Sequence, residues 1–225
     1  MVTEELKLKG GPKALTRLLQ RSRVLVFDFD GTLVDSTEIK GKAFENCFRS
    51  FPNRLEEILA YCRGNNHTVR TEKFRWVYEK ILGLPYTPEI ERQLGRTFEA
   101  CTTRQIVQAP EIPGAEGFLR ARQGRQTLVL LYSTPHEILL EILEGKGWRP
   151  LFSMVRGAPV VKAEFLLGFM RRESLAPGEM VFFGDTPEDA EAARKAGCPF
   201  VAVRSAPAAG GEGASIHDFR EIADE

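Results

Sequence analysis

The stretch Val24-Leu-Val-Phe-Asp-Phe-Asp-Gly-Thr-Leu-Val34 decides the fold of this chain. Its first four residues are apolar, as in a strand that is buried on both faces of a parallel sheet. Asp28 and Asp30 come where that strand should end, and Gly31 then permits a sharp turn. Ligands bind at the carboxyl ends of such strands, and two carboxylates there are costly without a cationic partner. Asp-Gly alone would be an ordinary turn, whereas the whole pattern predicts a functional site.

The rest of the chain shows two kinds of pattern. Residues 36–108 have helical periodicity and no strand signal, whereas from about residue 109 apolar strands alternate with amphipathic helices. The later strands are expected at 127–132, 152–155, 180–183 and 200–203. This alternation predicts an α/β fold with a Rossmann-like, doubly wound parallel sheet. We therefore expect an α/β core domain formed by 1–35 and 109–225, with an all-helical domain inserted at 36–108.

Local signals predict the individual helices. A short amphipathic helix around Leu15 and Leu18 should precede the first strand, and Asp35-Ser-Thr37 should cap the helix after it. An amphipathic segment at 68–82 follows a break at 64–67, and Thr87 before Pro88 is typical of a helix start. The remaining helices are expected at 53–62, 135–145, 162–172, 187–196 and 216–223.

Composition excludes several classes of protein. The 225 residues include 31 basic and 31 acidic side chains, so no net charge attracts the chain to nucleic acid or to an anionic membrane. Four widely spaced cysteines favour reduced thiols over a disulfide framework. The sequence has neither a signal-peptide core nor an apolar run of membrane-spanning length, so we expect a cytoplasmic protein. Its oligomeric state is left open.

A second group of polar residues follows the second predicted strand. Ser133 should end that strand, and Thr134-Pro135-His136-Glu137 resembles a capping box at the start of a helix. A helix N-terminus at this edge of the sheet offers free amide groups to a phosphate. Ser133 is the better candidate for a phosphate contact and Thr134 the second, although a helix cap alone would also explain these residues.

Two more polar groups follow at the later elements. Lys162 opens a predicted helix and could place an ammonium group at the same edge; Lys146, in a Gly-Lys-Gly turn, is a poorer candidate. Gly184-Asp-Thr-Pro-Glu-Asp189 follows the strand at 180–183. Thr186 and Asp189 would form a good helix N-terminus by themselves, but Asp185 has no structural reason to be acidic.

These four motifs resemble, in order and spacing, those of the haloacid dehalogenase-like superfamily, over about residues 23–203. The resemblance implies that Asp28 is a nucleophile that forms an aspartyl phosphate and that Asp30 is the general acid and base. It implies that Gly31, Thr32, Ser133 and Thr134 bind substrate and that Lys162 holds the phosphoryl group. The metal ligands would be Asp28, Asp30 and Asp185, with Asp189 acting through water or orienting Lys162. The expected cofactor is Mg²⁺, and the inserted helices would form a C1 cap domain.

The predicted function is Mg²⁺-dependent hydrolysis of a small phosphorylated metabolite, resembling the phosphoglycolate phosphatase and β-phosphoglucomutase branch. A hexose-phosphate mutase of the same superfamily is the alternative enzyme. A binding or regulatory module that has lost turnover is the alternative from another class. Arg70 and Lys73, at positions i and i+3 of a predicted helix, share a face and are expected to contact the substrate's non-reacting end.

Overall fold

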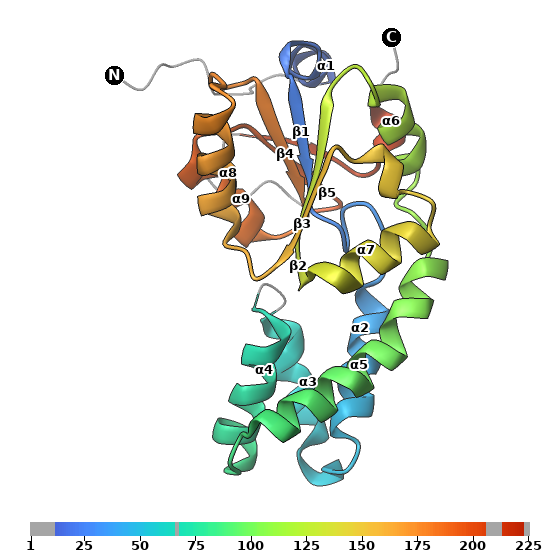
Figure 1. Cartoon of the computed structure of the whole chain (residues 1–225), viewed down its shortest axis with the longest axis vertical. Coiled ribbons are helices and arrows are strands. Elements are labelled where there is room, and N and C mark those ends of the chain that lie inside the picture. The colour runs from blue at the N-terminus through green and yellow to red at the C-terminus, as the bar shows by residue number, and fades with distance from the viewer. Residues whose placement is uncertain (1–11, 66–67, 206–212, 223–225) are drawn as a thin grey trace.

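The fold is built around a parallel sheet of six strands. The computed structural model describes residues 12–65, 68–205 and 213–222. Strand order across the sheet is β3-β2-β1-β4-β5-β6, and every neighbouring pair is parallel (Figure 1). The strands are β1 (Val24–Phe27), β2 (Thr127–Pro135), β3 (Met154–Ala158), β4 (Met180–Gly184), β5 (Phe200–Val203) and β6 (Gly213–Ile216). The predicted doubly wound α/β sheet is confirmed.

Strand β1 lies at the centre of the sheet because all four of its side chains are apolar. They are fully buried, and the strand pairs with β2 on one side and β4 on the other. The ring of Phe27 stacks on that of Phe183 with centroids 5.0 Å apart, which fixes β1 against β4. A strand buried on both faces has no room for a charged side chain until it ends, which is where Asp28 begins.

Helices cover both faces of this sheet, in two layers (Figure 1). One face packs against α8 (Lys162–Arg172) and α9 (Pro187–Ala196) through an apolar cluster that includes Leu166 and Phe169. The other packs against α1 (Pro12–Arg21), α6 (Ala115–Arg122) and α7 (His136–Gly145). Short 3-10 turns η4 (Arg149–Leu151) and η5 (Phe219–Glu221) complete that second layer.

The segment between β1 and α6 is helical and has an apolar core of its own. It comprises α2 (Thr37–Phe48), the 3-10 turn η2 (Pro52–Arg54), α3 (Leu55–Gly64), α4 (Arg70–Trp76), the π-helix η3 (Val77–Leu82) and α5 (Pro88–Gln108). Edge-to-face contacts among the rings of Phe44, Phe74 and Phe98 form its centre. Thr87 caps α5 by accepting a hydrogen bond from the amide of Ile90, as predicted. Figure 1 shows this helical segment as a separate lobe below the sheet.

The chain enters and leaves the helical segment at neighbouring points. The amide of Asp35 donates to the carbonyl of Pro110 at 3.0 Å, and the amide of Ile112 donates to the carbonyl of Leu33 at 2.9 Å. Lys146 follows the last residue of α7. Its Nζ donates a hydrogen bond of 2.8 Å to the carbonyl oxygen of Ala109, the C-cap residue of α5. The two connections are therefore fixed to each other and to the core.

Two predicted helices differ in the structure. The helix expected at 68–82 begins at Arg70 and becomes a π-helix at Val77, ending where Gly83 adopts a left-handed conformation. The helix expected at 216–223 is replaced by strand β6 and a single 3-10 turn. Pairing with β5 satisfies the backbone of residues 213–216 and so takes Ile216, the first residue of the predicted helix, into the sheet, and only Phe219–Glu221 of the rest form a helical turn. Residues 66–67, in the predicted break, lie outside the described residues.

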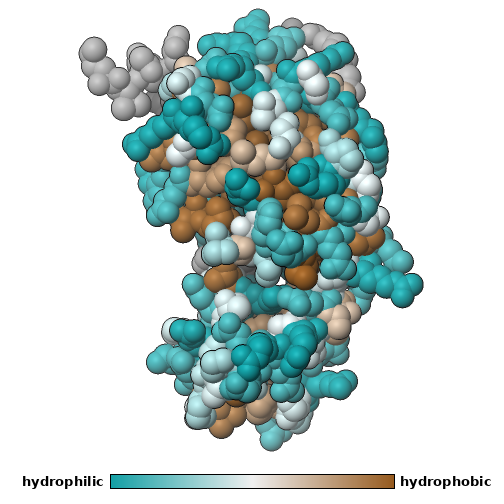
Figure 2. Space-filling model, viewed as in Figure 1, coloured by the Kyte–Doolittle hydropathy of each residue, from teal (hydrophilic) through white to brown (hydrophobic). Residues whose placement is uncertain are grey.

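The face of the molecule in Figure 2 carries both hydrophilic and hydrophobic residues. Hydrophilic side chains cover most of the helical segment there, and the hydrophobic ones gather mainly over the half that contains the sheet. Within the described part of the chain, no helix is both long enough and apolar enough to cross a membrane.

Candidate active site

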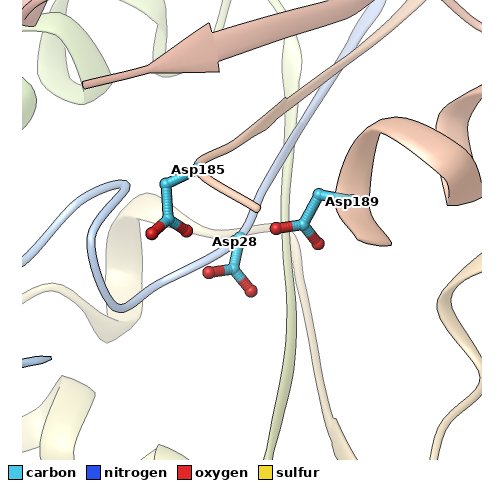
Figure 3. A group of neighbouring side chains, drawn as sticks. All are labelled: Asp28, Asp185 and Asp189. Atoms are coloured by element: carbon cyan, nitrogen blue, oxygen red, sulfur yellow. The ribbon is translucent and has the colours of Figure 1, made fainter. Parts of the chain in front are cut away.

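The candidate site lies where the strand order reverses, between β1 and β4. In open α/β sheets this switch point is the usual place of a ligand site, because the chain diverges there to opposite sides. Asp28 follows β1 directly and Asp185 follows β4, so the two side chains are neighbours at the carboxyl edge of the sheet. Asp189 joins them from the first turn of α9 (Figure 3).

The three carboxylates form a compact group with one ammonium partner. One oxygen from each of Asp28, Asp185 and Asp189 lies within 4.8 Å of the others, and Figure 3 shows the three side chains converging. Nζ of Lys162, in the first turn of α8, lies 2.5 Å from Oδ1 of Asp28 and 2.6 Å from Oδ1 of Asp189. Three negative charges face one positive charge when all are ionised, which leaves the group attractive to a divalent cation.

Burial and mutual repulsion perturb the ionisation of this group. Burial raises the pKa of Asp28 well above its ordinary value, and the neighbouring carboxylates raise it further against the opposing effect of Lys162. Burial and the charge of Asp189 raise the pKa of Asp185 to about 7. Burial by itself lowers the pKa of Lys162, but Asp28 and Asp189 reverse that effect and leave it above its ordinary value. Strongly perturbed carboxyls at a strand edge are typical of functional sites.

The turn after β1 is shaped by the approach of Asp185. Gly31 has a φ of 77°, and a Cβ atom there would lie 2.2 Å from Oδ2 of Asp185. Glycine is therefore needed for both its backbone conformation and its lack of a side chain. The hydroxyl of Thr32 is buried and lies 3.4 Å from Oδ1 of Asp185. The structure thus brings Gly31 and Thr32, two of the predicted substrate-binding residues, against a predicted metal ligand.

Asp189 has two contacts of different kinds. Besides its ion pair with Lys162, its Oδ2 accepts a hydrogen bond from the hydroxyl of Thr186 at 2.7 Å. The amide of Asp189 donates in return to that hydroxyl, which completes a capping box at the start of α9. The same side chain therefore forms the helix cap and contacts Lys162.

Asp30 lies beside this group but outside its three carboxylates. Its Oδ1 accepts a hydrogen bond from the hydroxyl of Ser36 at 2.5 Å, and its Oδ2 lies 2.5 Å from Nζ of Lys40. The phenol hydroxyl of Tyr132 also donates to Oδ2. Ser36 occupies the N-cap position of α2, as expected, but its hydroxyl bonds to Asp30 and makes no capping bond.

Sequence reasoning missed Lys40 and Tyr132. Tyr132 reads as one more apolar residue of a buried strand, and Lys40 as an ordinary residue of a helix. One signal was available for each. Lys40 follows Ser36 by one helical turn, which places both on the side of α2 that faces Asp30. Tyr132 is the last residue of its apolar run and carries a hydroxyl that needs a partner when buried.

The predicted capping box at Thr134 is wrong. Strand β2 continues to Pro135 and α7 begins at His136, with no side-chain cap. The backbone of residues 131–135 instead extends along β3, where the register shifts. In this irregular part of the strand Tyr132 is buried, whereas Ser133 and Thr134 are half-buried. The hydroxyl of Thr134 is within hydrogen-bonding reach of the phenol.

Arg70 and Lys73 have partners inside the helical segment. The guanidinium of Arg70 lies 2.8 Å from Oε1 of Glu99 and over the ring of Phe98. Lys73 is buried, and its Nζ donates to the carbonyl of Cys62 at 3.2 Å. Burial lowers the pKa of Lys73 to about 8. The structure therefore does not bring these two residues to the carboxylate group.

Comparison with known proteins identifies the family of this site. The model of the haloacid dehalogenase-like hydrolases matches residues 23–197, which include Asp28, Lys162 and Asp185. The chain belongs to this family. The predicted family and enzyme class are confirmed.

Its relatives in the haloacid dehalogenase-like family include phosphatases. Phosphoglycolate phosphatase of Synechococcus elongatus is 29% identical over 189 residues, covering 80% of this chain and 83% of that protein. Among solved structures, CbbY from Rhodobacter sphaeroides, in complex with phosphate, gives a TM-score of 0.69 at 17% identity, covering 89% of this chain and 96% of that one. A putative β-phosphoglucomutase from Thermotoga maritima gives 0.65 at 20% identity, covering 89% and 96%. The likeness to both structures confirms the fold.

The donor set of this haloacid dehalogenase-like site fits a hard divalent cation. Its three clustered side chains offer carboxylate oxygens only, without histidine or cysteine. Oxygen ligands of this kind suit Mg²⁺ better than Zn²⁺ or a copper ion. The cation would also offset the repulsion that raises the pKa of Asp28 and Asp185.

Proposed function

We propose that this chain is a Mg²⁺-dependent phosphatase that hydrolyses a small phosphate monoester through an aspartyl phosphate on Asp28. The observation that carries the proposal is the bridge from Lys162 to Asp28 and Asp189, beside Asp185 at the switch point of the sheet. An ammonium group in that place both orients the Asp28 carboxylate and attracts a phosphate toward it. The phosphatase relatives support the same reaction class.

The reaction has two steps, which use Asp28 and Asp30 in turn. In the first, a carboxylate oxygen of Asp28 attacks phosphorus, and the ester bond breaks as Asp30 gives a proton to the leaving oxygen. In the second, Asp30 takes a proton from water while the water oxygen attacks phosphorus. Phosphate then leaves and the Asp28 carboxylate is restored.

Lys162 and the metal ligands act on the charge of the phosphoryl group. Lys162 stays protonated, because its pKa lies above the ordinary value, and offsets repulsion between Asp28 and the anionic substrate. Asp28 and Asp185 would hold Mg²⁺, with Asp189 acting through water. When bound, Mg²⁺ neutralises charge on the phosphoryl oxygens and favours the ionised form of Asp28.

We take residues 36–108 as a cap domain and 1–35 with 109–225 as the core domain. The helical segment carries its own apolar core, and both of its connections to the sheet lie at one place. A lobe attached in this way next to the carboxyl edge is suited to cover the phosphoryl group and exclude bulk water.

Phosphate release from a panel of phosphorylated metabolites, with and without Mg²⁺, tests this function. Phosphoglycolate is the first substrate to try, because relatives of this chain are phosphoglycolate phosphatases. We expect Mg²⁺-dependent release from at least one small monoester, and its loss in Asp28→Asn checked by mass spectrometry for deamidation. Retained activity in that variant contradicts the nucleophile. Interconversion of hexose phosphates without net release indicates a mutase, and no turnover of any substrate indicates a binding module.

A further inference from the structure

Three side chains, those of Ser36, Lys40 and Tyr132, form hydrogen bonds or an ion pair with Asp30 and have no role in the reaction described above. Oδ2 of Asp30 contacts two donors, Nζ of Lys40 and the phenol of Tyr132, while Oδ1 contacts the hydroxyl of Ser36. Lys40 also donates to the oxygen of Tyr132, and its Nζ lies 4.5 Å from the centre of that ring. The Asp30 carboxyl is therefore bound on both oxygens by side chains from the core and the helical segment.

The phenol of Tyr132 is the least expected part of this network. The residue is 6% exposed and continues the apolar strand that packs against Phe29, with ring centroids 5.8 Å apart. Phenylalanine would fill the same space without a hydroxyl that has to be desolvated. Tyrosine therefore packs no better than phenylalanine would, and its hydroxyl forms hydrogen bonds with Asp30 and Lys40.

Lys40 reaches Asp30 from a different part of the chain. It lies at the end of the first turn of α2, the first helix of the helical segment, and its side chain is 26% exposed. The Asp30 side chain is only 11% exposed, so the contact is partly protected from water. A pair of this kind holds a carboxyl more firmly than one on an open surface.

We propose that Lys40 and Tyr132 are positioning residues that fix the Asp30 carboxyl for proton transfer to the leaving oxygen. This inference rests on the proposed function, in which Asp30 is the general acid. Lys40 and Tyr132 contact Oδ2 and Ser36 contacts Oδ1, so the carboxyl is held in one orientation. From this fixed orientation Asp30 gives its proton to the leaving oxygen while Asp28 bonds to phosphorus.

The dependence of rate on the leaving group tests the proposal. A dinitrophenolate leaves almost without protonation, whereas an alkoxide needs the proton of a general acid. The value of kcat/KM reports phosphoryl transfer to Asp28, so it is compared for 2,4-dinitrophenyl phosphate and an alkyl phosphate substrate. In Tyr132→Phe and Lys40→Met we expect the alkyl phosphate to lose about 10-fold more than the dinitrophenyl ester. Lys40→Arg should restore part of this loss.

Control variants separate positioning from folding. Lys42→Met, on an exposed site of the same helix, and Tyr61→Phe, in the helical segment, should leave the ratio of the two substrates unchanged. Thermal unfolding of every variant checks that it is folded. Equal losses on both substrates in Tyr132→Phe and Lys40→Met overturn the proposal, because they indicate phosphate binding or a structural role.

Asp30→Asn distinguishes a failure of this inference from a failure of the proposed function. If Asp30 is the general acid, Asp30→Asn shows the largest selective loss on the alkyl phosphate, and adding Tyr132→Phe to it costs little more. If Asp30→Asn leaves the substrate ratio unchanged, the acid role of Asp30 is itself wrong. Additive losses in the double variant mean that Tyr132 acts independently of Asp30, which contradicts positioning.

Discussion

Nζ of Lys162 lies 2.6 Å from Oδ1 of Asp189, whose other oxygen accepts a hydrogen bond from Thr186. Asp189 therefore ties the ammonium group of the site to the N-terminus of α9. Lys162 in turn reaches Asp28 with the same nitrogen. The position of the proposed nucleophile thus depends on the N-terminus of α9.

Substitution of Asp185 and of Asp189 should have different consequences. We expect Asp185→Ala to raise the Mg²⁺ concentration for half-maximal activity at least about 10-fold, because a direct carboxylate ligand is lost. Asp189→Ala should raise it less but lower the free energy of unfolding by about 1 kcal/mol, because the capping box is lost. Activity titrated against Mg²⁺, with denaturant unfolding of both variants, measures the two effects. Equal or reversed Mg²⁺ shifts would contradict the assignment.

Stability of the metal-free protein should depend on pH through Asp185. Its pKa is raised to about 7 in the folded chain, above the ordinary 3.8 expected on unfolding. Between these values the native state binds a proton that the unfolded state does not, so this group lowers stability as pH rises from about 4 to about 7. Without metal, Asp185→Asn should therefore be more stable than wild type at pH 8, by about 1–3 kcal/mol.

The difference in stability between wild type and Asp185→Asn should disappear near pH 4. It should reverse when Mg²⁺ is added at pH 8, since the ion binds the charged carboxylate of the wild type. Urea unfolding with a chelator present measures it, and Glu45→Gln, at an exposed position of α2, serves as the control. A stability difference that is constant from pH 4 to pH 8 would rule out this account.

Gly31→Ala should damage the site more than the backbone conformation alone explains. Gly31 and Gly83 both have positive φ values, 77° and 66°, but only at Gly31 would a Cβ atom meet another group, Oδ2 of Asp185. Gly83→Ala should cost about 1 kcal/mol of stability and leave activity intact. Gly31→Ala should also displace Asp185 and weaken activation by Mg²⁺. If the two variants have the same Mg²⁺ titration, Gly31 has no part in the site.

Arg70 is expected to stabilise the helical segment. Its side chain is 16% exposed and pairs with Glu99, so Arg70→Ala should lower the free energy of unfolding by about 1–3 kcal/mol. Arg92→Ala, which breaks an exposed pair with Glu89, should cost less than about 0.5 kcal/mol. A selective 10–100-fold loss of kcat/KM on the native substrate, with a generic aryl phosphate unaffected, would instead support the substrate contact first expected for Arg70.

The core of the fold is predictable from sequence because its strands are apolar and end in polar residues. β1 and β4 are bounded by Asp28 and Asp185, so both their place in the sheet and their functional edge follow from local pattern. The ends of α8 and α9 are likewise marked by Lys162 and Thr186. These signals are local in the chain, which is why the main group of site residues could be found without a structure.

Other features depend on contacts between distant segments. β6 exists because β5 offers it an edge, and β2 continues past Ser133 because β3 pairs with it. The local sequence of these segments does not predict either strand pairing. Lys40 and Tyr132 are separated by more than ninety residues and meet only when α2 packs over the end of β2. Arg70 reads as a surface cation until Glu99 is brought against it.

The adjoining entry and exit of the helical segment have a consequence for how such proteins diversify. Because Asp35 and Pro110 are hydrogen-bonded to each other, the seventy or so residues between them begin and end at nearly one point. An insertion of this geometry can be lengthened, exchanged or excised without altering the register of any strand. Under the proposed division into core and cap domains, most of the site residues belong to the core. Lys40 belongs to the helical segment but contacts Asp30, so it marks where a transplanted segment would have to be matched to its new host.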